Sequence, residues 1–258
     1  MIPVEFANVE MQLQIWLLAM LRPGAAFLAA PIFSAGAVPL QLRLVLALAI
    51  GIPSAAASGM ALPDAGMMSI PGLGAITSEI MAGLALGFAV QIGFAAALIA
   101  GETISNSMGL GFAAMADPTS GQMSPAIGQF LSMLATFLFL AADGHLALIA
   151  IMVESYSTIP PGAWLSSKAI MGLVQFGGLM FSAGLAIAMP VTAAMVVVQI
   201  ILAMISRSAP TLNLFSVGMP AALLVGILLL AISAPVMADA ISHALVVSLD
   251  HAATIAGG

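Results

Sequence analysis

The sequence contains no cysteine, which excludes disulfide bonds, thiolate metal sites and a cysteine nucleophile. Charged residues are also scarce, at 5% of the 258 residues, whereas a soluble domain carries about 25%. Four basic and ten acidic residues are too few to cover the surface of a soluble fold of this length. We therefore predict an integral membrane protein, or a subunit that is wrapped by other subunits.

Positive charge is especially rare. The formal net charge is −6, and the basic residues are Arg22, Arg43, Lys168 and Arg207. This argues against nucleic acid as a partner, because little basic charge is available to neutralise phosphates. The positive-inside rule compares the numbers of Lys and Arg in loops on the two sides of the membrane. Four basic residues are too few for this comparison, so membrane orientation is not predicted. The first residues, MIPVEFANVEMQ, lack the basic region of a secretory signal, and we expect them to be retained.

Hydrophobic residues make up 62% of the chain and gather in six long segments. Each segment is longer than a typical strand and lacks strict alternation, which predicts helices and an all-α fold. The segments are residues 13–33, 42–57, 80–100, 127–153, 169–205 and 214–237.

Several of these segments fit an ordinary membrane span poorly. Arg22-Pro23-Gly24 lies near the middle of the first, where an arginine costs about 2.5 to 3.5 kcal/mol and proline with glycine favours a break. As one helix, segment 169–205 would be ~55 Å long against a bilayer core of ~30 Å, and Pro190 predicts a kink in it.

Segment 80–100 is the exception, because it has the length of one span. Glu79 and Glu102 flank it and are interpreted as end charges. Gly83 and Gly87 form a GxxxG pattern that allows close helix contact. The alternative is that small residues are simply common in membrane helices.

Motifs for catalysis are missing. The sequence has no P-loop, no HExxH and no GxSxG. The stretch GLGFAA at 109–114 matches the G-x-G-x-x-A pattern of dinucleotide-binding proteins, but no predicted strand precedes it, as that fold requires. We predict that the chain is not an enzyme and binds no cofactor or metal.

Two aspartates leave alternatives open. Asp117 and Asp143 could share a proton as in an aspartyl protease, and Asp143 with His145 could form a proton relay in the membrane. However, Asp117-Pro118 and Asp143-Gly144 are turn signals. We favour a helix break at Asp143 whose polar groups satisfy freed backbone.

A loop rich in glycine and methionine, GLGFAAMADPTSGQMSP, occupies residues 109–125. Methionine is flexible and fills irregular gaps, and most of the 19 methionines are interpreted as packing. Met108, Met115 and Met123 bracket this loop, so it could deform and reseal around a passing object. Ordinary loop packing is the competing interpretation.

The stretch SRSAPTLNLFSVGMP at 206–220 joins two apolar segments as a helical hairpin. It resembles the R-x-x-P-x-x-N-x-F-x-x-G-x-P signature of the FliR family of flagellar export proteins, whose relatives serve virulence type III secretion. The matching residues are Arg207, Pro210, Asn213, Phe215, Gly218 and Pro220. Residues 30–47, 101–121 and 143–149 resemble further regions of that family in the same order.

This resemblance implies a structural subunit of the type III secretion export gate in the bacterial inner membrane, within the flagellar basal body and projecting toward the periplasm. One copy would assemble with several FliP and FliQ subunits and meet further export components. Residues 1–160 would be FliP-like and residues 161–258 a FliQ-like hairpin. The apolar faces, Arg22 and Arg43 would then be buried against protein.

By the same resemblance, residues 109–125 would plug a channel for unfolded flagellar proteins. The predicted plug residues are Met108, Gly109, Gly111, Phe112, Met115, Asp117, Pro118 and Met123. The main alternative is an ion-coupled secondary transporter with broken helices around a central site. It predicts a pair of corresponding broken segments, and the sequence shows no convincing repeat.

Overall fold

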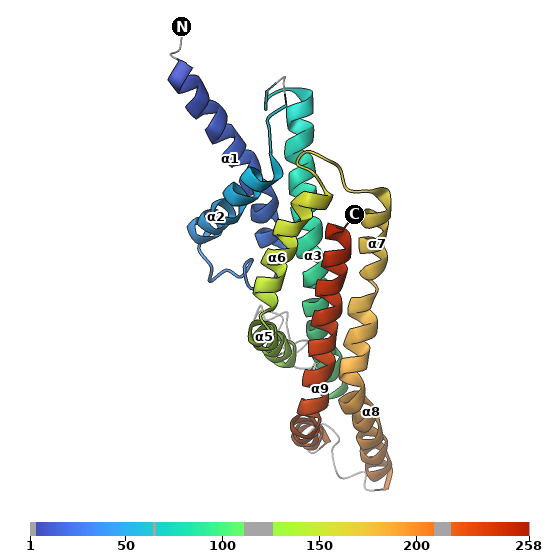
Figure 1. Ribbon diagram of the computed structural model, residues 1–258. Coiled ribbons are helices and arrows are strands. Elements are labelled where there is room, and N and C mark those ends of the chain that lie inside the picture. The colour runs from blue at the N-terminus through green and yellow to red at the C-terminus, as the bar shows by residue number, and fades with distance from the viewer. Residues whose placement is uncertain (1–3, 64–65, 111–125, 209–217, 258) are drawn as a thin grey trace. The chain divides into compact units, whose positions relative to one another are not determined.

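The computed structural model describes residues 4–63, 66–110, 126–208 and 218–257, and side chains from residue 9 onward (Figure 1). Every regular element in these ranges is a helix, which confirms the all-α prediction. In chain order and with the labels of Figure 1, the helices are α1 (Val4–Ala29), α2 (Leu40–Ser58), α3 (Ile70–Ser107), α5 (Ala126–Ala141), α6 (Gly144–Thr158), α7 (Ser167–Phe176), α8 (Leu179–Ser208) and α9 (Met219–Ala256).

Long apolar helices dominate the described part of the chain. Four stretches within it are long and apolar enough to cross a membrane: Leu40–Ser58, Ile70–Ser107, Ser167–Ser208 and Met219–Ala256. The pair α5 and α6, bent by 67°, adds a fifth if it counts as one span. This agrees with the membrane protein predicted from composition.

The chain divides into two compact units, each described by itself. The first unit comprises Met1–Ile92, Ala142–Gly177 and Val246–Gly258, and the second comprises Gly93–Ala141 and Gly178–Leu245. Helices α3 and α9 therefore contribute to both units. The predicted division at residue 160 rests on likeness to other subunits, and it stays a prediction.

In the first unit, α1 packs closely on α2 and α3. A Cβ on Gly83 would overlap the carbonyl oxygen of Arg22, and one on Gly87 would lie 2.6 Å from that of Ala26. A Cβ on Gly51 of α2 would overlap the carbonyl of Ala19. The GxxxG pattern thus marks a close helix contact, since only glycine leaves room for the α1 backbone here.

Helix breaks were predicted correctly at one site and wrongly at another. The fourth segment breaks at Asp143, which has a left-handed φ of 53° and lies between α5 and α6. Arg22-Pro23-Gly24, in contrast, lies inside an unbroken α1. The fifth segment divides at Gly177 and Gly178, and α8 runs on through Pro190.

Two helices are longer than the apolar runs that predicted them. Because α3 extends over Ile70–Ser107, Glu79 and Glu102 lie inside it, and their interpretation as end charges is wrong. The last segment does not end at Met237, because α9 continues to Ala256. Its added turns are amphipathic and bury Ile241, Leu245, Ala252 and Ile255 with helical spacing.

In the second unit, the long helices leave broad apolar faces uncovered. Phe181, Leu185 and Ile200 of α8 are each more than half exposed, as are Leu224 and Ile232 of α9. Exposed apolar surface on this scale marks contact with lipid or with other proteins.

Candidate functional site

The structure describes only part of the residues predicted to form the plug and the hairpin turn. Met108 and Gly109 of the plug, and Arg207, Gly218 and Pro220 of the turn, lie in described segments. The remaining predicted residues lie outside them: Gly111, Phe112, Met115, Asp117, Pro118, Met123, Pro210 and Asn213.

The first end of the central loop is anchored at the end of α3, in the second unit. Met108 is 2% exposed, and a Cβ on Gly226 of α9 would overlap its side chain. The Gln199 side chain of α8 donates a hydrogen bond of 2.6 Å to the Ser107 carbonyl. Gly109 then adopts a left-handed φ of 81°, a conformation that commonly ends helices at glycine. The chain therefore leaves α3 from a packed position.

The second end of the loop is anchored by two glycines. A Cβ on Gly101 of α3 would overlap the backbone of Gly128, which lies in the first turn of α5. Gly128 is buried, and no larger residue at position 101 would allow this approach without a shift. Residues 109–125 are thus flanked by closely packed segments, and only Met108 and Gly109 of the predicted plug are seen.

The flanks of the hairpin turn follow ordinary helix-end chemistry. Arg207 is exposed in the last turn of α8, where a cation interacts favourably with the helix dipole. Pro220 lies in the first turn of α9, where its missing N–H has no helical partner to lose.

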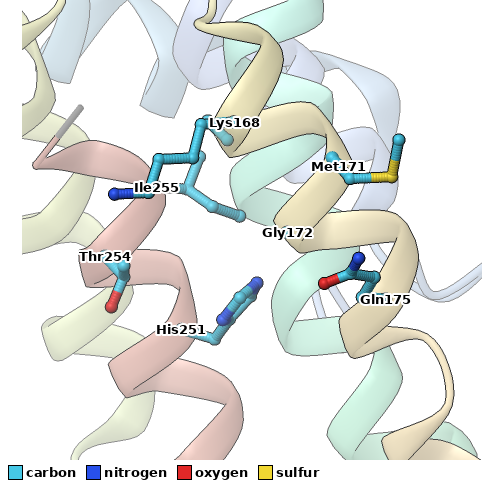
Figure 2. A pocket seen from close by; sticks show the side chains of 8 residues that line it. Lys168, Met171, Gly172, Gln175, His251, Thr254 and Ile255 are labelled. Atoms are coloured by element: carbon cyan, nitrogen blue, oxygen red, sulfur yellow. The ribbon is translucent and has the colours of Figure 1, made fainter.

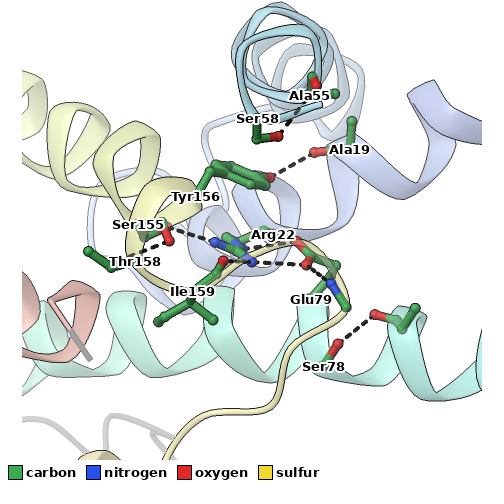
Figure 3. A network of polar contacts seen from close by, with 12 residues as sticks. Ala19, Arg22, Ala55, Ser58, Ser78, Glu79, Ser155, Tyr156, Thr158 and Ile159 are labelled. Carbon is green, nitrogen blue, oxygen red and sulfur yellow. Dashed lines mark hydrogen bonds and ion pairs between the residues drawn. The ribbon is translucent and has the colours of Figure 1, made fainter. Parts of the chain in front are cut away.

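A fully buried ion pair in the first unit is the main polar feature of the described chain (Figure 3). Arg22 Nε and Nη2 each donate to a Glu79 carboxylate oxygen at 2.9 Å. Arg22 also donates to Ser155 Oγ and to the Ile159 carbonyl, both at 3.0 Å. Glu79 Oε1 accepts from the Gly162 backbone N–H at 3.0 Å. This network joins α1, α3, α6 and the segment after α6.

Such a pair is stable only when both partners stay satisfied. Arg22 and Glu79 have side-chain exposures of 0%, and bidentate arginine–carboxylate geometry gives strong, directional hydrogen bonds. Removing one partner from a buried pair leaves the other charge without compensation. Arg22 is therefore buried against protein as expected, but its partner is in the same chain. Arg43 is partly exposed and donates to the Ala35 carbonyl at 2.7 Å.

Tyr156, the single tyrosine of the chain, explains why Pro23 does not break α1. Pro23 has no N–H, so the carbonyl four residues earlier, at Ala19, loses its helical donor. The Tyr156 hydroxyl donates to that carbonyl at 3.1 Å (Figure 3). The Tyr156 ring also lies 4.0 Å from the Arg22 guanidinium carbon, a cation–π contact.

We expect Tyr156→Phe to destabilise the subunit by about 1 to 2 kcal/mol, because it leaves a buried carbonyl unsatisfied while keeping the ring over Arg22. The measurement is thermal unfolding of the purified chain in detergent. The matched test is Pro23→Ala, which restores an N–H to pair with the Ala19 carbonyl. In that background Tyr156→Phe should cost less than half as much, and equal costs in both backgrounds would refute this role of the hydroxyl.

The relay pair of Asp143 and His145 finds little support, and Asp117 of the alternative protease pair lies outside the described residues. Asp143 precedes α6, and its side chain makes no capping hydrogen bond. Its carbonyl accepts from the N–H groups of Leu146 and Ala147 at 2.9 and 3.0 Å, so the backbone and not the carboxylate satisfies the helix start. His145 Nδ1 is buried without a partner in the described residues. Nor does that part of the chain hold three or more metal-ligating side chains together.

The family model of "Bacterial export proteins, family 1" matches residues 13–246. The chain belongs to this family. The match includes Arg22, Glu79 and Tyr156, and it spans the whole central loop. It ends ahead of the last turns of α9.

Curated relatives of this export family agree with the assignment. The chain is 37% identical over 232 residues to "Flagellar biosynthetic protein FliR" of Escherichia coli (strain K12), covering 90% of this chain and 88% of the relative. It is 35% identical over 215 residues to the protein of that name from Pectobacterium carotovorum, covering 83% and 82%. For the Caulobacter vibrioides protein of that name the identity is 30% over 227 residues, covering 86% and 89%. The resemblance to FliR found in the sequence is thereby confirmed.

Membership in the export family came from sequence signals, whereas the Arg22 network did not. Arg22 was singled out only as costly in a membrane, and Glu79 only as a helix end. A weak signal existed, since these two residues carry opposite charges in or beside apolar segments. No sequence signal predicted Tyr156 as their neighbour.

Proposed function

We propose that this chain is a structural subunit of the flagellar type III secretion export gate and forms part of the channel for unfolded flagellar proteins. The observation that carries the proposal is its membership in the bacterial export family, with FliR relatives matched over most of their length. The role is structural and not enzymatic.

The uncovered helix faces support a role within a larger assembly. Residues such as Val197 and Ile200 of α8, and Leu228 and Ile232 of α9, are more than half exposed. Faces of this kind need lipid or apolar protein against them. In the proposed gate, a single copy of this chain contacts several FliP-like and FliQ-like subunits, together with further export components.

The central loop is proposed to plug the closed channel. Its composition supports this role, because Phe112, Met115 and Met123 offer deformable apolar contacts. Its flanks support it too, because the packing of Met108 on Gly226 and of Gly101 on Gly128 gives the loop firm ends. The proposed location is the bacterial inner membrane at the flagellar basal body, projecting toward the periplasm.

The test is to purify the chain from native membranes in mild detergent and to weigh the intact assembly by mass spectrometry. We expect one copy of this chain with several copies of two smaller hydrophobic proteins. The control is an inner-membrane transporter with the same tag, purified in parallel. A lone monomer or a homodimer of this chain would refute the gate and favour the ion-coupled transporter.

A further inference from the structure

A groove in the first unit lies between α7 and the last turns of α9 (Figure 2). Its volume is about 360 Å³. Lys168, Met171 and Gln175 line it from α7, and His251, Thr254 and Ile255 line it from α9. The α9 residues lie beyond residues 13–246, which the export family model matches, whereas the α7 residues lie within them.

The groove combines an apolar wall with an unpaired cation. Lys168 is exposed and forms no hydrogen bond or ion pair within the described residues. It is also the only lysine in a chain of net charge −6. Gln175, two helical turns further along α7, is also exposed and carries an amide donor. The Lys168 ammonium, which points toward Thr254 and away from Gln175 (Figure 2), suits a phosphate better than a cation.

The facing helix adds polar atoms but no carboxylate to the lining. The His251 ring stacks on Phe176, with centroids 3.9 Å apart and planes 11° apart. His251 Nε2 is buried without a hydrogen-bond partner among the described residues. The Thr254 hydroxyl donates to the Asp250 carbonyl at 3.0 Å, so only its lone pairs remain for a ligand. Asp250 is exposed but does not line the groove.

The position of the groove along the chain points to a membrane surface. Lys168 is the second residue of an apolar stretch, Ser167–Ser208, that is long enough to cross a bilayer. Trp164, 62% exposed, lies just before it, and Val174, 69% exposed, lies within it. Tryptophan and lysine at the end of an apolar span are typical of the head-group level.

We propose that this groove binds an anionic phospholipid. The lipid phosphate contacts the Lys168 ammonium, which points toward the Thr254 side of the groove (Figure 2), and an acyl chain runs along the exposed side chains of Met171 and Val174. Charge complementarity selects an anionic head group, because a zwitterionic lipid would place its own cation beside Lys168. The proposal requires that the chain lies in a membrane, but it does not require the export-gate role.

Because Lys168 is the only lysine, it offers a single-site probe. Reductive methylation with ¹³C-formaldehyde keeps its charge and labels only this side chain and the N-terminal amine. The experiment follows the ¹³C resonance of methylated Lys168 in the full chain, in detergent, while lipid is added. We expect a saturable shift with phosphatidylglycerol and none with phosphatidylcholine of the same acyl chains. Inorganic phosphate at equal concentration should leave the resonance in place.

Native mass spectrometry of variants supplies the second readout. Lys168→Gln should lower the amount of bound phosphatidylglycerol by roughly fivefold to tenfold, as expected for one charged contact, and Lys168→Arg should retain most of it. The matched control is Arg207→Gln, which removes the other exposed cation and should leave binding unchanged.

Several results would overturn the proposal. Equal binding of the two lipids, or full binding by Lys168→Gln, would show that Lys168 selects no anionic head group. Saturation by inorganic phosphate alone would make the groove a free-anion site. A shift that appears only when other subunits are added would assign the groove to a protein partner. Each of these results is independent of whether the chain assembles into a gate.

Discussion

Replacing Arg22 with alanine is expected to destabilise the subunit by about 3 to 5 kcal/mol, the range for breaking a buried ion pair. The substitution leaves the fully buried Glu79 carboxylate with the Gly162 N–H as its remaining donor among the contacts described. Folded proteins have only about 5 to 15 kcal/mol of net stability. We therefore expect most of the variant subunit to misfold and to be degraded in the cell. The measurement is its abundance in membranes by immunoblot, together with swimming motility.

The matched variants separate charge from packing. Glu79→Ala should lower the abundance of the subunit in the same way, because it leaves the buried Arg22 guanidinium without its carboxylate partner. Arg22→Met combined with Glu79→Met removes both charges at similar volume and should recover most of the abundance, since apolar replacement of buried pairs is often neutral. Arg207→Ala, at an exposed position in the last turn of α8, should have little effect. If the double variant is no more abundant than Arg22→Ala alone, the two charges are not coupled.

Replacing the apolar side chains of the central loop is expected to make the closed gate leak. The variant changes Phe112, Met115 and Met123 to glycine. If each side chain contributes roughly 1 kcal/mol of apolar contact to the closed state, their joint loss raises the open fraction on the order of a hundredfold. The measurement is uptake of a small solute by intact cells that express the variant subunit and retain the assembly.

A control in the same loop adds the same number of glycines without removing apolar contacts. Thr119→Gly, Ser120→Gly and Gln122→Gly together increase backbone freedom equally but should leave the membrane tight. An assembled apolar variant that remains impermeable would refute the plug role. Equal leakage from both variants would assign the effect to loop flexibility and not to apolar sealing.

Local features of the chain were predictable because they depend on near neighbours in sequence. The apolar segments identified helices, and Asp143-Gly144 correctly marked the break between α5 and α6. Gly83 and Gly87 marked a real contact, although their partner surface on α1 was unknown. The end of α9 was missed because its amphipathic turns bury Ile241, Leu245 and Ala252 at spaced positions and form no continuous apolar run.

The candidate site was predictable only in part. The signature around Arg207, Gly218 and Pro220 was enough to identify the export family, which the comparison confirms. The packing of Met108 against Gly226 was not foreseen, because these residues meet only when α3 lies on α9. The predicted plug role of Met108 is unaffected by this contact and stays a prediction.

The sequence alone determined that this is an all-helical membrane protein of a bacterial export family, because composition, apolar run length and signature residues need no knowledge of contacts. Only the tertiary structure decided what Arg22, Pro23 and Glu79 do. Arg22 and Glu79 are separated by 57 positions, and the Tyr156 donor to Ala19 by 137. Helix packing joins such distant groups, since a buried charge or a freed carbonyl must find its partner wherever the fold provides one.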